Sequence, residues 1–289
     1  FDPDRRKIYG SLELKHDAIG AGVIARTGWD PNPEDNFYLV SFDVDAIDRM
    51  EKDAEKDGIM TAVYLKEVLE DYQAPGHRYG CSGIDGTAYG PVFGMPADSS
   101  KKIMICYGVY GDVTREDNDH QVILQYDPAT IDALGQPLTQ KAPHHSGCPC
   151  EARYFFYTGN THYGVQNLEY DPFTRAYLTA VYTGKKDRFP NYPLFFIDAA
   201  KAPAESILAG RGGERGLLLE SAAPALGVDC TVGGCWFPLG QTGVYAFGNG
   251  TYAFSQHLNR IEESGIRTFA SEVVLYRLDD ADESVFAEI

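Results

Sequence analysis

Four apolar runs that each end in aspartate limit the fold of this 289-residue chain more than any other feature. The runs are NFYLVSFD, HQVILQYD, YPLFFID and SEVVLYRLD, which end at Asp43, Asp127, Asp198 and Asp279. Successive aspartates are 84, 71 and 81 residues apart. Aromatic and β-branched residues are typical of strands, and an Asp carboxylate favours a turn because it accepts hydrogen bonds from nearby backbone N–H groups. The pattern predicts four copies of one strand, each followed by a turn.

Other segments recur in the same order around these runs. Segments with the pattern of a preceding strand begin at Arg5, Lys101, Arg175 and Gly243, and those of a still earlier strand begin at His77, Thr161 and Asp229. A fourth strand fits residues 61–69, 152–159 and 216–221. A four-stranded unit repeated in tandem resembles the blade of a β-propeller. The resemblance covers nearly the whole chain but concerns architecture alone, because WD and kelch signatures are absent.

The resemblance implies an all-β protein that forms a single β-propeller domain over residues 1–289. Four blades are visible, at approximately 1–75, 76–159, 160–226 and 227–289. Phe1-Asp2-Pro3 matches Tyr170-Asp171-Pro172, so the chain is expected to start within the first strand of blade 1. Because an open sheet edge invites association, we expect an upstream segment to complete the first and last blades. That segment could also hold a fifth blade.

Charge and hydropathy exclude two classes of partner. The formal net charge is −17, whereas nucleic-acid binding needs a basic surface that displaces counterions. No apolar run approaches the roughly 18 residues of a membrane-spanning helix. The six cysteines fit both an exported protein with some disulfides and a cytoplasmic protein with free thiols, so the compartment stays open.

Two loops carry candidate metal ligands. The segment HHSGCPC offers His144, His145, Cys148 and Cys150, which are zinc-type ligands, although Cys-x-Cys is shorter than the usual zinc-binding spacing. The segment GDVTREDNDH offers carboxylates to Ca²⁺ at Asp112, Glu116, Asp117 and Asp119, without the pattern of an EF-hand. The alternative for each is an ordinary irregular loop. No cofactor is predicted beyond a divalent metal, Ca²⁺ or Zn²⁺, at these positions.

Propeller geometry indicates where a ligand site would lie. First strands line the central channel of a propeller, so the polar residues that enter it from each blade should meet at one mouth. The candidates are His77, Arg78, Tyr79, Asp85, His162, Tyr163, Glu169, Asp229 and Trp236. Imidazole and guanidinium groups could hold an anionic small molecule, with His77 or His162 as acid or base. The recurrent Tyr-Gly pairs at 79–80 and 163–164 are also explained by turns and packing.

Two functions from different classes follow. The first is a binding module that takes a small molecule, a glycan or a protein at the polar mouth. The second is a metal-assisted hydrolase or lyase similar to lactonase-type propellers, whose metal ligands are Glu, Asn and Asp from several blades. Glu169, Asn167 and Asp85 could supply these ligands, but blade 4 offers Gly233, Gly234 and Trp236 instead. Gly-x-Ser-x-Gly and His-Glu-x-x-His motifs are absent, and the binding module is therefore preferred.

Overall fold

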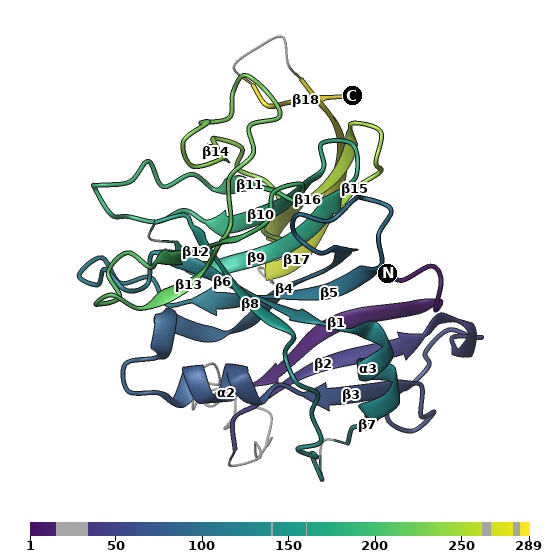
Figure 1. Cartoon of the computed structure of the whole chain (residues 1–289). Helices are drawn as coiled ribbons and strands as arrows, with labels where there is room; N and C mark the ends of the chain where they lie inside the picture. Colours follow the sequence, from purple (N-terminus) through teal and green to yellow (C-terminus); the bar gives the residue numbers. More distant parts are fainter. Residues whose placement is uncertain (16–33, 140, 160, 262–266, 280–283) are drawn as a thin grey trace.

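The structure is a computed structural model that describes residues 1–15, 34–139, 141–159, 161–261, 267–279 and 284–289. It is all-β, as predicted, with four sheets that follow one another from the N-terminal to the C-terminal part of the chain (Figure 1). Two short helices, α2 (Lys66–Gln73) and α3 (Pro128–Leu134), accompany them. Among the described residues, no helix is long and apolar enough to cross a membrane.

The sheets are numbered in chain order, and the strands of each sheet are given in the order in which they pair. The first sheet contains β1 (Lys7–Leu14), β2 (Asn36–Asp43), β3 (Met60–Tyr64) and β7 (Gln136–Pro137). The second contains β12 (Ala204–Ile207), β13 (Arg215–Leu218), β8 (Ala152–Tyr157), β6 (His120–Tyr126), β5 (Lys101–Val109) and β4 (Cys81–Pro91). The third contains β14 (Gly234–Cys235), β11 (Leu194–Asp198), β10 (Ala176–Tyr182) and β9 (His162–Asp171). The fourth contains β15 (Val244–Ala246), β16 (Thr251–Ile261), β17 (Arg267–Leu278) and β18 (Phe286–Glu288).

Neighbouring strands are antiparallel throughout these sheets, except that β13 runs parallel to β8. Four strands lie side by side where consecutive sheets meet, because β1 packs on β4, β4 on β9, and β9 on β15. We call β1, β4, β9 and β15 the inner strands. The packing is tight: a Cβ atom on Gly86 of β4 would lie 2.8 Å from a methyl carbon of Val165 in β9. The inner strands therefore bring residues distant in sequence into one region.

The turns at Asp2 and Asp171 have the same hydrogen bonds. Asp2 and Lys7 exchange two backbone hydrogen bonds, and Asp171 pairs with Ala176 in the same antiparallel manner. The carboxylates of Asp2 and Asp171 both accept from the backbone N–H groups two and three residues later. The predicted turn-forming aspartates behave similarly, because the carboxylates of Asp43, Asp127 and Asp198 each accept from a backbone N–H that follows within three residues.

Several strands pair differently from the prediction. Residues 61–69 form the end of β3 and then the start of α2, whose Val68 and Tyr72 are buried. Residues 216–221 were expected to complete the third sheet, but β13 joins the second sheet, and only the residues near Ser221 bridge to β11. The physical reason is apolar packing, since Leu217 and Leu219 enter the core beside β8, where Leu219 donates its N–H to the Phe155 carbonyl.

The last sheet also differs. The predicted first strand after Asp229 contributes β14 to the third sheet, where Cys235 pairs with Leu194 and is buried in the same core. The segment after Gly243 forms two strands, β15 and β16, rather than one. From Gln256 onwards, β16 continues and pairs with β17 in antiparallel register. Each outer edge is thus covered from further along the chain: β7 covers the first sheet, β12–β13 the second and β14 the third.

Candidate functional site

Carboxylates connect each inner strand to the next. Glu13 in β1 accepts a hydrogen bond from the backbone N–H of Ile84 in β4, at 2.9 Å. Glu169 accepts from the backbone N–H of Ala246, at 3.1 Å. These two contacts have a structural role, because each carboxylate satisfies a backbone donor of the neighbouring sheet.

Asp85 is different, because its carboxylate meets a side chain rather than a backbone group. The Nε2 atom of Gln166 donates to Asp85 Oδ2 at 3.3 Å. Asp85 is solvent-exposed, yet a Cβ atom on Gly108 would lie only 2.6 Å from Oδ2, so protein crowds it on one side. This desolvation, with the negative charge of Glu13 as a smaller cause, raises the pKa of Asp85 to about 6. Asp85 is consequently ionised at neutral pH but titrates within the physiological range.

A lysine ammonium lies beside this carboxylate. Lys15 Nζ is 2.7 Å from Glu13 Oε1 and donates to the Ser82 carbonyl at 2.6 Å. Its charge lowers the pKa of Asp85 and partly offsets the effect of Glu13. Lys15 directly after β1, Asp85 in β4 and Gln166 in β9 therefore bring an ammonium, a carboxylate and an amide from three sheets into one region.

Tyr163 extends this group towards solvent. Its backbone has φ 66°, a strained conformation for a residue with a side chain, and half of the residue is exposed. Gln166 Nε2 donates to the Tyr163 carbonyl at 3.0 Å as well as to Asp85. The Tyr163 ring lies against His162, with centroids 4.1 Å apart. The structure thus brings together three predicted residues, Asp85, His162 and Tyr163, which with Gln166 and Lys15 we call the inner-strand cluster.

Gln166 and Lys15 were missed from the sequence. An amide carries no charge and belongs to no metal or catalytic motif, so Gln166 attracts no notice alone. The available signal was its position directly before Asn167 in a strand already assigned to the channel.

His77, Arg78 and Tyr79 lie in a different network. Tyr79 is buried, and its hydroxyl donates to Glu214 Oε1 at 2.5 Å. Arg78 pairs with the same carboxylate oxygen at 3.0 Å, and the His77 ring contacts the Tyr72 carbonyl at 2.6 Å. Guanidinium groups of Arg78, Arg153 and Arg211 approach the Tyr79 ring at 4.9, 5.5 and 4.6 Å. These contacts join the second sheet to the turn before β13, and none of them involves Asp85.

Asp229 and Trp236 lie at the outer edge of the third sheet, because the segment that carries them forms β14. The Asp229 carboxylate accepts from the N–H and hydroxyl of Thr231 and from the hydroxyl of Tyr192. Trp236 is 66% exposed and packs edge-on against Tyr192. The expected convergence of these two residues with Asp85 is therefore not seen.

The predicted zinc ligands have separate partners. His144 Nδ1 accepts from the Ser146 N–H, and His145 Nε2 contacts Asn36 Oδ1 at 3.1 Å. Burial raises the pKa of the Cys148 thiol to about 12, which disfavours the thiolate that metal binding needs. Cys150 Sγ contacts the Ala152 carbonyl at 2.9 Å, and its pKa is likewise raised by burial. Over the part of the chain that the structure describes, no three His, Cys, Asp or Glu residues are placed to hold a metal ion.

Three of the four predicted calcium ligands are paired with cations of the protein itself, and the fourth, Asp112, accepts hydrogen bonds from Thr114. Asp117 pairs with Arg115 and Arg211, and Glu116 pairs with Arg188. Asp119 pairs with Lys186 and Arg188. The Lys186 ammonium also contacts Asn118 Oδ1 and the Arg115 carbonyl. It is therefore surrounded by oxygen atoms, as a metal cation would be.

Asn167 and Glu169, the remaining candidates for a lactonase-like metal set, face the fourth sheet. Asn167 Nδ2 donates to the carbonyls of Gly240 and Gln241 at 2.8 and 3.1 Å. Together with the Glu169 contact to Ala246, these bonds hold β9 against the segment that leads into β15. Their arrangement is explained by packing between sheets.

Glu169 offers a test of this description through pH. Burial raises the pKa of Glu169 to about 7, above its ordinary value of 4.5, with the Ala246 hydrogen bond opposing the change. The folded state therefore binds more protons than the unfolded state between about pH 4.5 and 7, and stability should rise as pH falls through this window. We expect Glu169→Gln, which keeps an oxygen acceptor, to raise the free energy of unfolding at pH 8 by up to about 3 kcal/mol.

Urea denaturation of both proteins between pH 5 and 8 measures this effect. The advantage of Glu169→Gln should shrink steadily towards pH 5, where the wild-type carboxyl is protonated. A constant difference across this range, or a variant that is less stable at pH 8, would show that Glu169 is needed as a charge.

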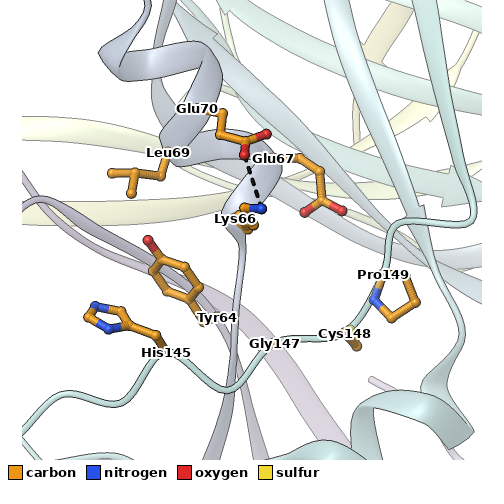
Figure 2. A pocket seen from close by; sticks show the side chains of 9 residues that line it. All are labelled: Tyr64, Lys66, Glu67, Leu69, Glu70, His145, Gly147, Cys148 and Pro149. Carbon is orange, nitrogen blue, oxygen red and sulfur yellow. Dashed lines mark ion pairs between the residues drawn. The ribbon is translucent and has the colours of Figure 1, made fainter.

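A pocket of about 600 Å³ lies apart from the inner strands, between α2 and the loop that follows His144 (Figure 2). It is lined by Tyr64, Lys66, Glu67, Leu69, Glu70, His145, Gly147, Cys148 and Pro149. The loop is anchored to β3 because the Tyr64 N–H donates to the Ser146 carbonyl at 2.8 Å. Two residues of the predicted zinc loop, His145 and Cys148, thus line a pocket.

Comparisons of the chain with protein-family models, with curated proteins and with solved structures gave no match. The function is therefore argued from the geometry of the sites alone.

Proposed function

We propose that this protein is a binding module of the β-propeller type, in which the inner strands surround the ligand site. Three features support this architecture: the recurrent Asp-ended strands, the equivalent turns at Asp2 and Asp171, and the side-by-side packing of β1, β4, β9 and β15. In such an arrangement ligands are bound where the inner strands of several blades meet. The inner-strand cluster occupies that position.

The ligand that best fits the inner-strand cluster is a hydroxyl-rich small molecule, such as the terminal sugar of a glycan. The observation that carries this proposal is the exposed Tyr163 ring, whose strained backbone is held by Gln166 next to the ionised Asp85. Backbone strain of this kind costs about 1–3 kcal/mol and persists where surrounding contacts over-determine it. An aromatic ring provides an apolar platform for the C–H face of a sugar.

Polar groups around that ring complement sugar hydroxyls. The Asp85 carboxylate accepts hydrogen bonds, the Gln166 amide both donates and accepts, and Lys15 donates. Hydrogen bonds to a charged acceptor contribute about 1.5–3 kcal/mol each, so Asp85 should supply much of the affinity. The contacts of Asn167 and Glu169 with the fourth sheet give the metal-assisted hydrolase less support.

Titration calorimetry with a panel of neutral monosaccharides and disaccharides tests the proposal. We expect binding to be weakened at least about tenfold by Asp85→Asn and by Tyr163→Ala. Affinity should also fall between pH 7 and 5, because Asp85 loses its charge near pH 6. Trp236→Ala is the matched control, since Trp236 is also an exposed aromatic residue, 66% against 50% for Tyr163, but lies at the outer edge of the third sheet.

Two results would count against a sugar site. One is that no sugar of the panel binds at millimolar concentration. The other is that binding occurs but is reduced equally by Trp236→Ala and Tyr163→Ala.

A further inference from the structure

The pocket beside α2 contains a buried carboxylate oxygen without a partner. Glu67 Oε1 accepts from the Cys150 N–H at 3.1 Å, whereas Glu67 Oε2 is buried and receives no hydrogen bond from any described residue. The hydroxyl of Tyr126 is also buried and unpartnered within the described ranges, and the charge of Glu67 contributes to its raised pKa. A buried acceptor left unsatisfied destabilises the folded protein, and the cost is larger if the acceptor is charged.

Nearby cations of the protein are engaged elsewhere. Arg153 pairs with Asp71 at 3.1 Å, and Lys66 pairs with Glu70, one turn further along α2, at 3.3 Å (Figure 2). Among the residues described, no ion pair to Glu67 is formed. The Lys66–Glu70 pair is largely exposed, so it contributes little and does not prevent a ligand from entering.

The rest of the lining is apolar or aromatic. Leu69 and Pro149 present hydrocarbon to the pocket, and Tyr64 lies with its ring 4.8 Å from the His145 ring in an edge-on arrangement. Aromatic faces attract cations, and hydrocarbon surfaces favour an apolar body. The pocket therefore combines an unpaired acidic oxygen with an apolar wall.

We propose that this pocket binds a small primary amine with an apolar body. The ammonium group donates to the Glu67 carboxylate, and the apolar body packs against Tyr64, Leu69 and Pro149. The strongly negative net charge of the protein, −17, raises the local concentration of such cations. This site is separate from the inner-strand cluster and does not depend on the proposed sugar binding.

The experiment compares three probes of equal shape by titration calorimetry at pH 7.5: 2-phenylethylamine, 2-phenylethanol and phenylacetate. We expect the amine to bind at least about tenfold more tightly than the alcohol, and phenylacetate to bind least. Equal affinity for the amine and the alcohol would overturn the proposal. A Kd for the amine above about 10 mM would also overturn it.

Variants locate the binding. Glu67→Gln preserves shape and removes the charge, so it should weaken amine binding about tenfold or more. Asp98→Asn removes the charge of an exposed carboxylate that does not line the pocket, and it should change the affinity less than about threefold. Leu69→Trp fills the pocket and should abolish binding. It tests the site independently of Glu67→Gln, should that variant fail to fold. Unchanged amine binding in Leu69→Trp, or loss of it in Asp85→Asn, would place the amine outside this pocket.

Discussion

Replacing Asp119 with Asn is expected to lower the free energy of unfolding by about 3–5 kcal/mol. Lys186 is only 3% exposed in its side chain, and its ammonium is 2.6 Å from Asp119 Oδ1. Its other contacts, Asn118 Oδ1 and the Arg115 carbonyl, are neutral oxygens. Removal of the Asp119 charge would leave a buried ammonium without a counter-charge, which is far more costly than the loss of an exposed ion pair.

A double-mutant cycle in urea distinguishes this effect from a general loss of packing. Lys186→Met should restore part of the stability that Asp119→Asn removes, because the double variant contains no unpaired buried ammonium. Glu116→Gln is the control, since Glu116 is 71% exposed in its side chain and also pairs with Arg188. We expect that control to change stability by less than about 1 kcal/mol. If the free energy of unfolding of Asp119→Asn lies within about 1 kcal/mol of the wild-type value, Lys186 finds another counter-charge.

Gly164→Ala should lower the free energy of unfolding by about 2–4 kcal/mol. Gly164 has φ +69°, which favours glycine, and a Cβ atom there would collide with the backbone nitrogen of Val109 in β5. Because the obstacle is backbone, it cannot move aside as a flexible side chain would. The same change should displace Tyr163, so any ligand of the inner-strand cluster should bind more weakly.

Gly212→Ala separates conformational strain from collision. Gly212 has φ +60°, but nothing lies within 4 Å of the position that a Cβ atom would take. That variant should lose only about 1 kcal/mol, which is the cost of the backbone conformation alone. Thermal unfolding of both variants gives the comparison. Equal losses in the two proteins would show that β9 can shift away from β5.

Local features of the fold were predictable from the sequence because their signals are local. The Asp-ended strands and the turn at Asp171 depend on hydrogen bonds within a few residues, so composition reveals them. Pairing partners were harder to predict. The segment around Cys235 has the pattern of a strand, but that pattern does not say which sheet will bury the thiol. Strand propensity reports a half-buried surface and leaves the neighbour undetermined.

The candidate site was predictable to a similar extent. Asp85 and Tyr163 were identified because repeated inner strands place equivalent positions together. Arg78 and Tyr79 were equally polar and equally well placed in the repeat, yet Glu214, more than a hundred residues away, pairs with both. No pattern near residue 78 indicates that partner. Contacts distant in sequence decide whether a polar side chain is available to a ligand.

Three sheets receive their outer strands from a later part of the chain, and this affects how the protein folds during synthesis. During synthesis the first sheet keeps an open edge until β7 emerges, about seventy residues after β3. Translation adds ~5–20 residues per second, so this edge stays open for several seconds. The second sheet waits in the same way for β12 and β13, and the third for β14. The edge of each of these three sheets is thus exposed to unwanted pairing until its last strand has been made. The first three sheets are consequently interlocked in time as well as in space, whereas the fourth is built from consecutive strands.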